Sequence, residues 1–213
     1  MTDDRLRLFI AIELPTAWRE ALVREEQALE AAVPGFARWV KPELMHLTLL
    51  FLGAQPQAVL DRVHRSMEAV CTGRPAFSLE PGELGSFGSP RSLRVIWAGV
   101  RDLPPGSLGL LQRGLVDALA EAGVRWEPSD FHPHLTLGRA NRREPAARSE
   151  AMHRALKGRA TASSALAALQ PFRCESIDLI RSDLRREGPS YTCIHRSQLG
   201  ARSQLGTQDE PAS

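Results

Sequence analysis

The chain has 213 residues, of which 43% are hydrophobic and 24% charged, and its net charge is +2. This size and composition are typical of a globular protein with a buried core, organised as one domain or as two small lobes. The small net charge excludes nucleic-acid binding by the surface as a whole, so local clusters of arginine matter more. No apolar run reaches the roughly 18 residues of a membrane span, and charged residues near the N-terminus would interrupt a signal peptide. We therefore expect a cytoplasmic protein that does not enter a membrane.

The first half of the chain predicts alternating strands and helices. The apolar run Leu6–Leu14 predicts a strand, and Thr16–Val33 has a helical pattern that a Pro-Gly pair ends. A strand that contains His46–Leu49 follows. Apolar residues at helical spacing predict a helix over Ala58–Cys71, and a short strand begins at Phe77.

The second half repeats this order and adds two strands at its end. The alanine- and serine-rich residues 158–170 fit no predicted element. The letters Arg-Ser-Gln-Leu-Gly occur at 196–200 and again at 202–206, before a polar end, so we expect one folded domain over 1–196 and a disordered tail over 197–213. The cysteines at 71, 174 and 193 are widely separated and are expected to be free thiols. The predicted elements are strands over Leu93–Val100, around His134–Leu137, over Ser176–Arg181 and over Tyr191–Arg196, with helices over Ser107–Ala122 and Pro145–Leu156.

Two segments about 88 residues apart are similar to each other, which indicates an internal duplication. Each contains Arg-Trp, a nearby proline and then His-Leu-Thr-Leu, where the histidine is His46 in the first copy and His134 in the second. A strand, a helix and a turn precede the histidine strand in both halves. The sequence therefore predicts an α+β fold of two duplicated strand-helix-strand units.

The duplicated motif places polar side chains on one face of a strand. Side chains two residues apart point the same way, so His46 projects with Thr48, and His134 projects with Thr136. If the halves are related by a pseudo-two-fold axis, these pairs face each other across a central cleft. Two imidazoles can then act as acid and base on opposite sides of a phosphodiester. The threonine hydroxyls can donate to non-bridging oxygens, which gives a site that needs no metal.

These motifs resemble those of the two-histidine (2H) phosphoesterase superfamily. More closely, the chain from about residue 5 to 196 is similar to the bacterial and archaeal RNA 2',3'-cyclic phosphodiesterases, historically called 2'-5' RNA ligases. Two His-x-Thr motifs with matching flanking residues are much more specific evidence for this family than a single one. The similarity is carried by Arg7–Pro15, His46–Gly53, Phe87–Arg91 and Phe131–Arg139, with Ser182–Leu184 and Tyr191–Thr192 near the end.

The resemblance implies a two-lobed α+β fold with antiparallel sheets around a central cleft. It implies hydrolysis of an RNA-terminal 2',3'-cyclic phosphate to a 2'-phosphomonoester, with no metal and no cofactor. His46 would be the proton donor to the departing 3' oxygen and His134 the proton acceptor from water, and reversal with an RNA 5'-hydroxyl would make a 2'-5' bond. Arg139 would neutralise phosphate charge. His132 stands where relatives usually have arginine, which puts one expected phosphate contact in question.

Other interpretations stay open at this point. The same site could act on another cyclic or 2'-5' nucleotide, or it could be a non-catalytic groove that binds RNA. His132 and His134 share one strand face, which could indicate zinc, although no further ligand lies at a recognisable spacing. Since one chain holds both motifs, we expect a monomer. Four aromatic residues are expected to pack in the core: Phe9, Trp39, Phe51 and Trp126. The two tryptophans could instead stack on bases, and an aromatic residue near the cleft could stack on a terminal base.

Overall fold

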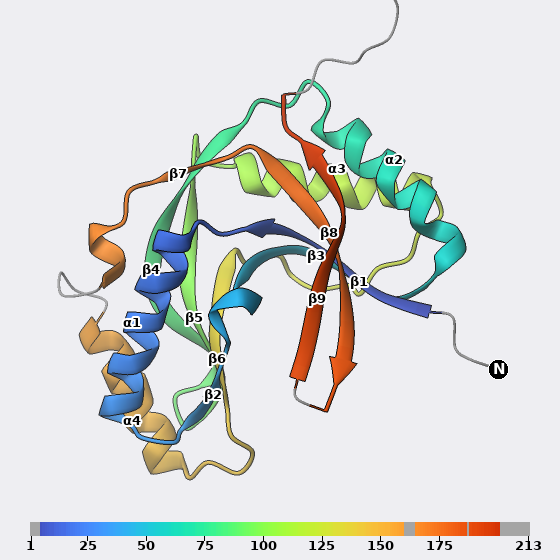
Figure 1. Cartoon of the computed structure of the whole chain (residues 1–213). Helices are drawn as coiled ribbons and strands as arrows, with labels where there is room; N and C mark the ends of the chain where they lie inside the picture. The colour runs from blue at the N-terminus through green and yellow to red at the C-terminus, as the bar shows by residue number, and fades with distance from the viewer. Residues whose placement is uncertain (1–4, 160–164, 187, 201–213) are drawn as a thin grey trace, which may run out of the picture.

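The computed structural model describes residues 5–159, 165–186 and 188–200. This part of the chain forms a curled, nine-stranded antiparallel sheet covered by four α-helices (Figure 1). The predicted α+β class with antiparallel strands is confirmed. The helices are α1 (Thr16–Ala32), α2 (Leu60–Cys71), α3 (Ser107–Glu121) and α4 (Ala146–Arg159), with short 3-10 turns at η1 (Pro42–Leu44), η2 (Gln57–Val59) and η3 (Ala165–Ala168).

The two strands that carry the histidine motifs lie side by side in the middle of the sheet. The strand order is β7-β4-β5-β6-β3-β1-β8-β9, and β2 also pairs with β6. Because β3 pairs with β6, the two halves of the duplicated chain share one continuous sheet. The strands are β1 (Arg5–Glu13), β2 (Ala37–Trp39), β3 (His46–Pro56), β4 (Phe77–Ser89), β5 (Ser92–Leu103), β6 (His134–Ala140), β7 (Phe172–Cys174), β8 (Ser176–Arg185) and β9 (Gly188–Gln198).

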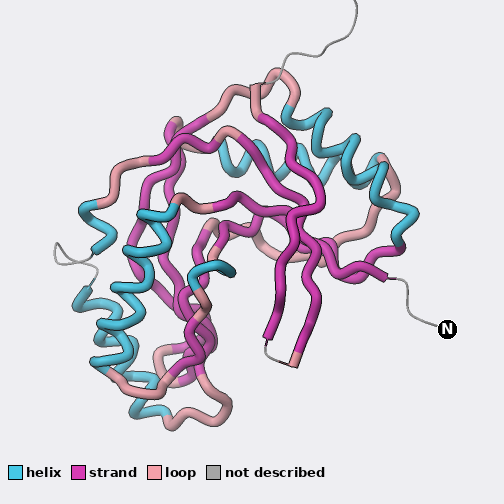
Figure 2. The backbone as a smooth tube through the Cα atoms, in the orientation of Figure 1, coloured by secondary structure: helices cyan, strands magenta, loops and turns pink. Residues whose placement is uncertain are grey.

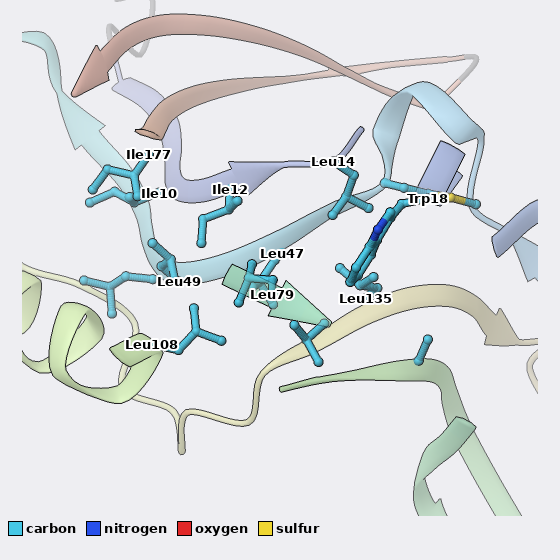
Figure 3. Close-up of a cluster of buried hydrophobic side chains, with 14 of the residues drawn as sticks. Ile10, Ile12, Leu14, Trp18, Leu47, Leu49, Leu79, Leu108, Leu135 and Ile177 are labelled. Carbon is cyan, nitrogen blue, oxygen red and sulfur yellow. The ribbon is translucent and has the colours of Figure 1, made fainter. Parts of the chain in front are cut away.

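The helices bury their apolar sides against the leucine-bearing face of the sheet. Helix α1 lies beside α4, and α2 lies beside α3 at the other end (Figures 1 and 2). Figure 3 shows Leu47 and Leu135 of the two histidine strands in the same cluster as Trp18 of α1 and Leu108 of α3. The motif leucines therefore belong to the core, as the alternation predicts, and the histidines point to the opposite face.

The two halves share an irregularity in strand register directly after the histidine motif. Between β1 and β3, Ala11 pairs with Thr48 and the register then shifts by one residue. Between β5 and β6, Trp97 pairs with Thr136 and the register shifts at the corresponding place. Each shift is a β-bulge that adds one unpaired residue to the histidine strand. The duplication thus extends from the sequence motif to the backbone geometry that follows it.

Several boundaries differ from the sequence prediction. Strand β4 is 13 residues long rather than short, because a register shift against β5 accommodates Pro81 and the glycine after it. The helix predicted from Ala58 starts as the turn η2 and becomes α-helical at Leu60. Strand β9 continues to Gln198 and Leu199 is buried, so the folded chain extends past the predicted limit at residue 196. Part of 158–170 forms η3, whereas 160–164 and residues 201–213 of the tail predicted over 197–213 lie outside the described residues.

Predictions for individual side chains were mostly confirmed. All three cysteines are free thiols, Phe9 is buried, and both Trp39 and Trp126 pack against the core. The prediction that Phe51 packs in the core was wrong, because 41% of this residue is exposed. No helix in the described part of the chain is long and apolar enough to span a membrane.

Candidate active site

Strands β3 and β6 bring the two motifs together on one face of the sheet. They pair at Leu47 and Leu135, both of which are fully buried. Continuing this antiparallel register places each histidine opposite the threonine of the other motif. These four side chains are partly buried and project from the face opposite the core. We call this surface the histidine face; it carries His46, Thr48, His134 and Thr136.

Both imidazoles are held by the same backbone contact. The Nδ1–H of His46 donates to the Leu44 carbonyl oxygen at 2.7 Å, and the Nδ1–H of His134 donates to the His132 carbonyl oxygen at 2.6 Å. A carbonyl oxygen can only accept, so this contact fixes the hydrogen on Nδ1. The Nε2 atom of each ring is left to exchange a proton with a bound substrate.

Aromatic rings pack against each histidine. Phe9 stacks on His46 with 4.7 Å between ring centroids, and Tyr191 meets the same imidazole edge-on at 5.4 Å. Phe87 meets His134 edge-on at 4.9 Å. These rings restrict the imidazoles to one orientation and remove water from their sides, which is the kind of support that a preorganised site needs.

Trp97 packs beside His134, and Gly85 leaves room for its ring. A Cβ atom at Gly85 would clash with the Trp97 ring, so a glycine is needed where the indole lies across β4. From this position Trp97 contacts Phe87 at 5.5 Å and His132 at 5.7 Å between ring centroids. Its buried Nε1–H has no hydrogen-bond acceptor among the described residues.

The surroundings lower the pKa of both histidines. Burial lowers the pKa of His46 to about 4; the Leu44 carbonyl opposes this effect and the charge of His134 adds to it. Burial also lowers the pKa of His134, aided by His132 and Arg139 and opposed by the hydrogen bond to the His132 carbonyl. Both rings are therefore neutral near pH 7 in the free protein. A bound anion would favour the protonated form and return a proton to the pair.

A β-bulge turns Arg139 toward the histidines. Strict alternation from His134 would place residue 139 on the leucine face, because the two positions are an odd number of residues apart. After the register shift, however, Arg139 pairs with Val95, as Thr136 pairs with Trp97, so Arg139 lies on the histidine face. Its charge lowers the pKa of His134 and opposes the rise that burial causes in the pKa of Tyr191.

The first half carries an aromatic residue at the equivalent position. Phe51 follows His46 by five residues, as Arg139 follows His134, and it comes after the corresponding bulge. Its ring lies 5.9 Å from Phe9, and 41% of the residue is exposed. The duplicated site is therefore chemically asymmetric, with an exposed ring on one side and a cation on the other.

All five residues predicted from the sequence lie on this face, whereas three aromatic residues were not predicted there. Among the described residues, no group of three or more His, Cys, Asp or Glu side chains is arranged to hold a metal ion. His132 and His134, the pair that could indicate zinc, therefore gain no third ligand in this part of the protein. The aromatic residues that the sequence analysis missed are Phe87, Trp97 and Tyr191. Two signals could have identified Phe87 and Tyr191: Phe87 lies in a segment that resembles the family, and Tyr191 is the only tyrosine of the chain.

Comparison with known proteins agrees with this geometry. Residues 15–186 match the model of the 2'-5' RNA ligase superfamily. The chain belongs to this family. It is 31% identical to the RNA 2',3'-cyclic phosphodiesterase of Thermus thermophilus over 202 residues, which cover 91% of this chain and 90% of the relative. It is 29% identical to the protein of that name in Methanothermobacter thermautotrophicus over 193 residues, and this match covers 88% of this chain and 96% of the relative. Enzymes with this name are hydrolases, so the predicted family and enzyme class are confirmed.

Solved structures of this fold extend over nearly the whole chain. TT0787 of Thermus thermophilus has a TM-score of 0.71 and 26% identity, and the match covers 91% of this chain and 98% of that one. Escherichia coli LigT, solved in complex with 3'-AMP, has a TM-score of 0.62 and 26% identity, with 92% and 98% covered. LigT has also been solved in complex with phosphate.

Proposed function

We propose that this protein hydrolyses RNA-terminal 2',3'-cyclic phosphates to 2'-phosphomonoesters by metal-independent acid and base catalysis. The observation that carries the proposal is the pairing of β3 with β6 at Leu47 and Leu135, which places two equally held imidazoles on one face. In-line attack on phosphorus, with a base for the incoming water and an acid for the leaving oxygen, uses two such groups at once. His46 and His134 supply them.

The proton transfers follow from the chemistry of a cyclic phosphodiester. His134 Nε2 accepts a proton from water as the water oxygen forms a bond to phosphorus. The bond from phosphorus to the 3' oxygen breaks, and His46 donates a proton to that oxygen. The product keeps its phosphate on the 2' oxygen, and the pair returns to its starting state by exchanging one proton with solvent. The assignment of donor and acceptor follows the family resemblance, because the register is symmetric about Leu47 and Leu135.

The remaining predicted residues stabilise charge on the phosphate. Hydroxyls of Thr48 and Thr136 lie on the histidine face and can donate to the two non-bridging oxygens. Arg139 adds a permanent positive charge on the same face as His134. Negative charge on the bound substrate also raises the pKa of a neighbouring imidazole, which makes the donor histidine available near neutral pH.

The asymmetry of the site orients a nucleotide. The exposed ring of Phe51 can stack on a base, while Arg139 attracts the phosphate. LigT was solved with 3'-AMP and with phosphate, which supports a nucleotide end as the ligand of this chain. With an RNA 5'-hydroxyl in place of water, the reverse reaction would join two RNAs through a 2'-5' bond.

Turnover in a chelator tests this proposal. Short RNAs and nucleosides with a 2',3'-cyclic phosphate are incubated with the protein in EDTA, and the products are compared with authentic 2'- and 3'-phosphates by chromatography. We expect hydrolysis with release of the 2' isomer only. Release of the 3' isomer would mean that the 2' oxygen leaves, not the 3' oxygen. Turnover that requires added metal would contradict the mechanism. Binding of RNA without turnover would favour a non-catalytic module.

A further inference from the structure

A second arginine lies directly opposite Arg139. Strand β2 pairs with β6 so that Arg38 is the cross-strand partner of Arg139, and both residues are exposed. Directly opposed residues of an antiparallel pair point to the same face. Arg38 therefore also lies on the histidine face, on the strand next to that of Arg139.

This pair places like charges where the sheet would favour opposite ones. Like charges directly opposite each other destabilise a strand pair. A different cross-strand pair in the same sheet follows the rule, because Arg101 lies opposite Glu80 and donates from Nε to its carboxylate at 2.8 Å. In the described part of the chain, neither Arg38 nor Arg139 has a side-chain hydrogen bond or an ion pair, and the other cross-strand partner of Arg139 is the apolar Val95. The sheet itself therefore gains nothing from this pair, whereas a bound anion would relieve its repulsion.

We propose that Arg38 is a specificity-determining residue that binds the phosphate upstream of the reacting one. This phosphate is the phosphodiester that joins the terminal nucleotide to the rest of the RNA. The inference rests on the proposed function, in which Arg139, on the same face of β6 as His134, neutralises the cyclic phosphate. Arg38 lies one strand farther from His134, which suits a second phosphate of the same chain. The preferred substrate is then an RNA end with at least one internal phosphodiester, and a nucleoside cyclic phosphate is hydrolysed without the contact to Arg38.

The test compares two substrates that differ in the upstream phosphate. Adenylyl-adenosine 2',3'-cyclic phosphate has one, and adenosine 2',3'-cyclic phosphate has none. Arg38→Gln should lower kcat/KM for the dinucleotide roughly tenfold or more, as loss of a charged hydrogen bond does, and should leave kcat/KM for the nucleoside within about twofold of the wild type. Arg38→Lys should recover part of the loss, since a lysine keeps the charge without the planar fork. Arg24→Gln, which removes an exposed charge from α1, is the matched control and should change neither value.

Two further measurements separate substrate binding from folding and from chemistry. Arg38→Gln should unfold at a temperature no lower than the wild type in the absence of ligand, because it removes a like-charge pair. The affinity for adenylyl-adenosine 2'-phosphate should fall in this variant, and its dependence on salt should weaken by about one phosphate contact. Binding of adenosine 2'-phosphate should stay unchanged.

The outcomes distinguish this inference from the function on which it rests. An equal loss of kcat/KM for both substrates, or no loss for either, would overturn the role of Arg38 while the hydrolysis itself stands. If the wild type turns over neither substrate, the proposed function fails, and the two binding measurements then decide the role of Arg38. Equal affinities of wild type and Arg38→Gln for the dinucleotide would reject that role as well.

Discussion

Replacing Tyr191 with alanine should raise the pKa of His46. Burial holds this pKa at about 4, against an ordinary value of 6.5. At about 1.4 kcal/mol for each pKa unit, the neutral ring is favoured by roughly 3 kcal/mol. Tyr191 and Phe9 are the two rings packed against His46, so removing one of them should recover part of this energy, roughly 1 to 2 kcal/mol. The pKa of His46 should then rise from about 4 to about 5 or somewhat above.

An NMR titration of the histidine ring protons measures this change, with the His46 signal assigned by its loss in His46→Asn. Tyr191→Phe is the matched control, because it keeps the ring that excludes water and removes only the hydroxyl. We expect the pKa of His46 in Tyr191→Phe to stay at the wild-type value. A wild-type His46 that titrates near 6.5, or a Tyr191→Phe variant that changes as much as Tyr191→Ala, would refute the argument from burial.

Three substitutions test buried charges and packing in α1 and in the sheet. Burial raises the pKa of Glu26 to about 8 from 4.5, so its contribution to stability is fully present below pH 4.5 and is lost as the pH rises toward 8. Glu26→Gln should therefore raise the free energy of unfolding by roughly 2 to 4 kcal/mol at pH 9 and by little at pH 4 in urea titrations. Gly85→Ala should displace Trp97, lowering this free energy by roughly 1 to 3 kcal/mol and reducing kcat/KM as well. Arg196 donates hydrogen bonds to both carboxylate oxygens of Asp178, a residue that is 3% exposed. Arg196→Met leaves this buried carboxylate without its cation and should lower the free energy of unfolding by roughly 3 kcal/mol. Adding Asp178→Asn removes the buried charge and should restore part of the loss.

The sequence predicted the parts of this protein that depend on local patterns. The repeated His-Leu-Thr-Leu placed four polar side chains on one face, because alternation in a strand is set by the backbone. The same rule would have put Arg139 on the wrong face, since the bulge that turns it depends on pairing with β5, far away in the chain. The opposition of Arg38 and Arg139 was hidden for the same reason, because it requires β2 to pair with β6.

The aromatic surroundings of the histidines could not be predicted from spacing. Phe9, Phe87, Trp97 and Tyr191 come from four different strands, β1, β4, β5 and β9. In the sequence, each of these aromatic residues indicates only that its segment suits a β-strand. Their contacts with the imidazoles arise when the sheet curls and brings distant strands to the same site.

The central claim is that His46 and His134 act as one acid and base pair, and kcat/KM of single and double variants tests it most directly. The assay is hydrolysis of an RNA 2',3'-cyclic phosphate in EDTA by His46→Ala, His134→Ala and the double variant, with His153→Ala of α4 as the control. We predict that each single variant loses roughly 10² or more, that the double variant is little worse than the weaker single one, and that the control keeps full activity. A single variant with wild-type activity, or a double variant whose loss is the product of the two single losses, would contradict the claim.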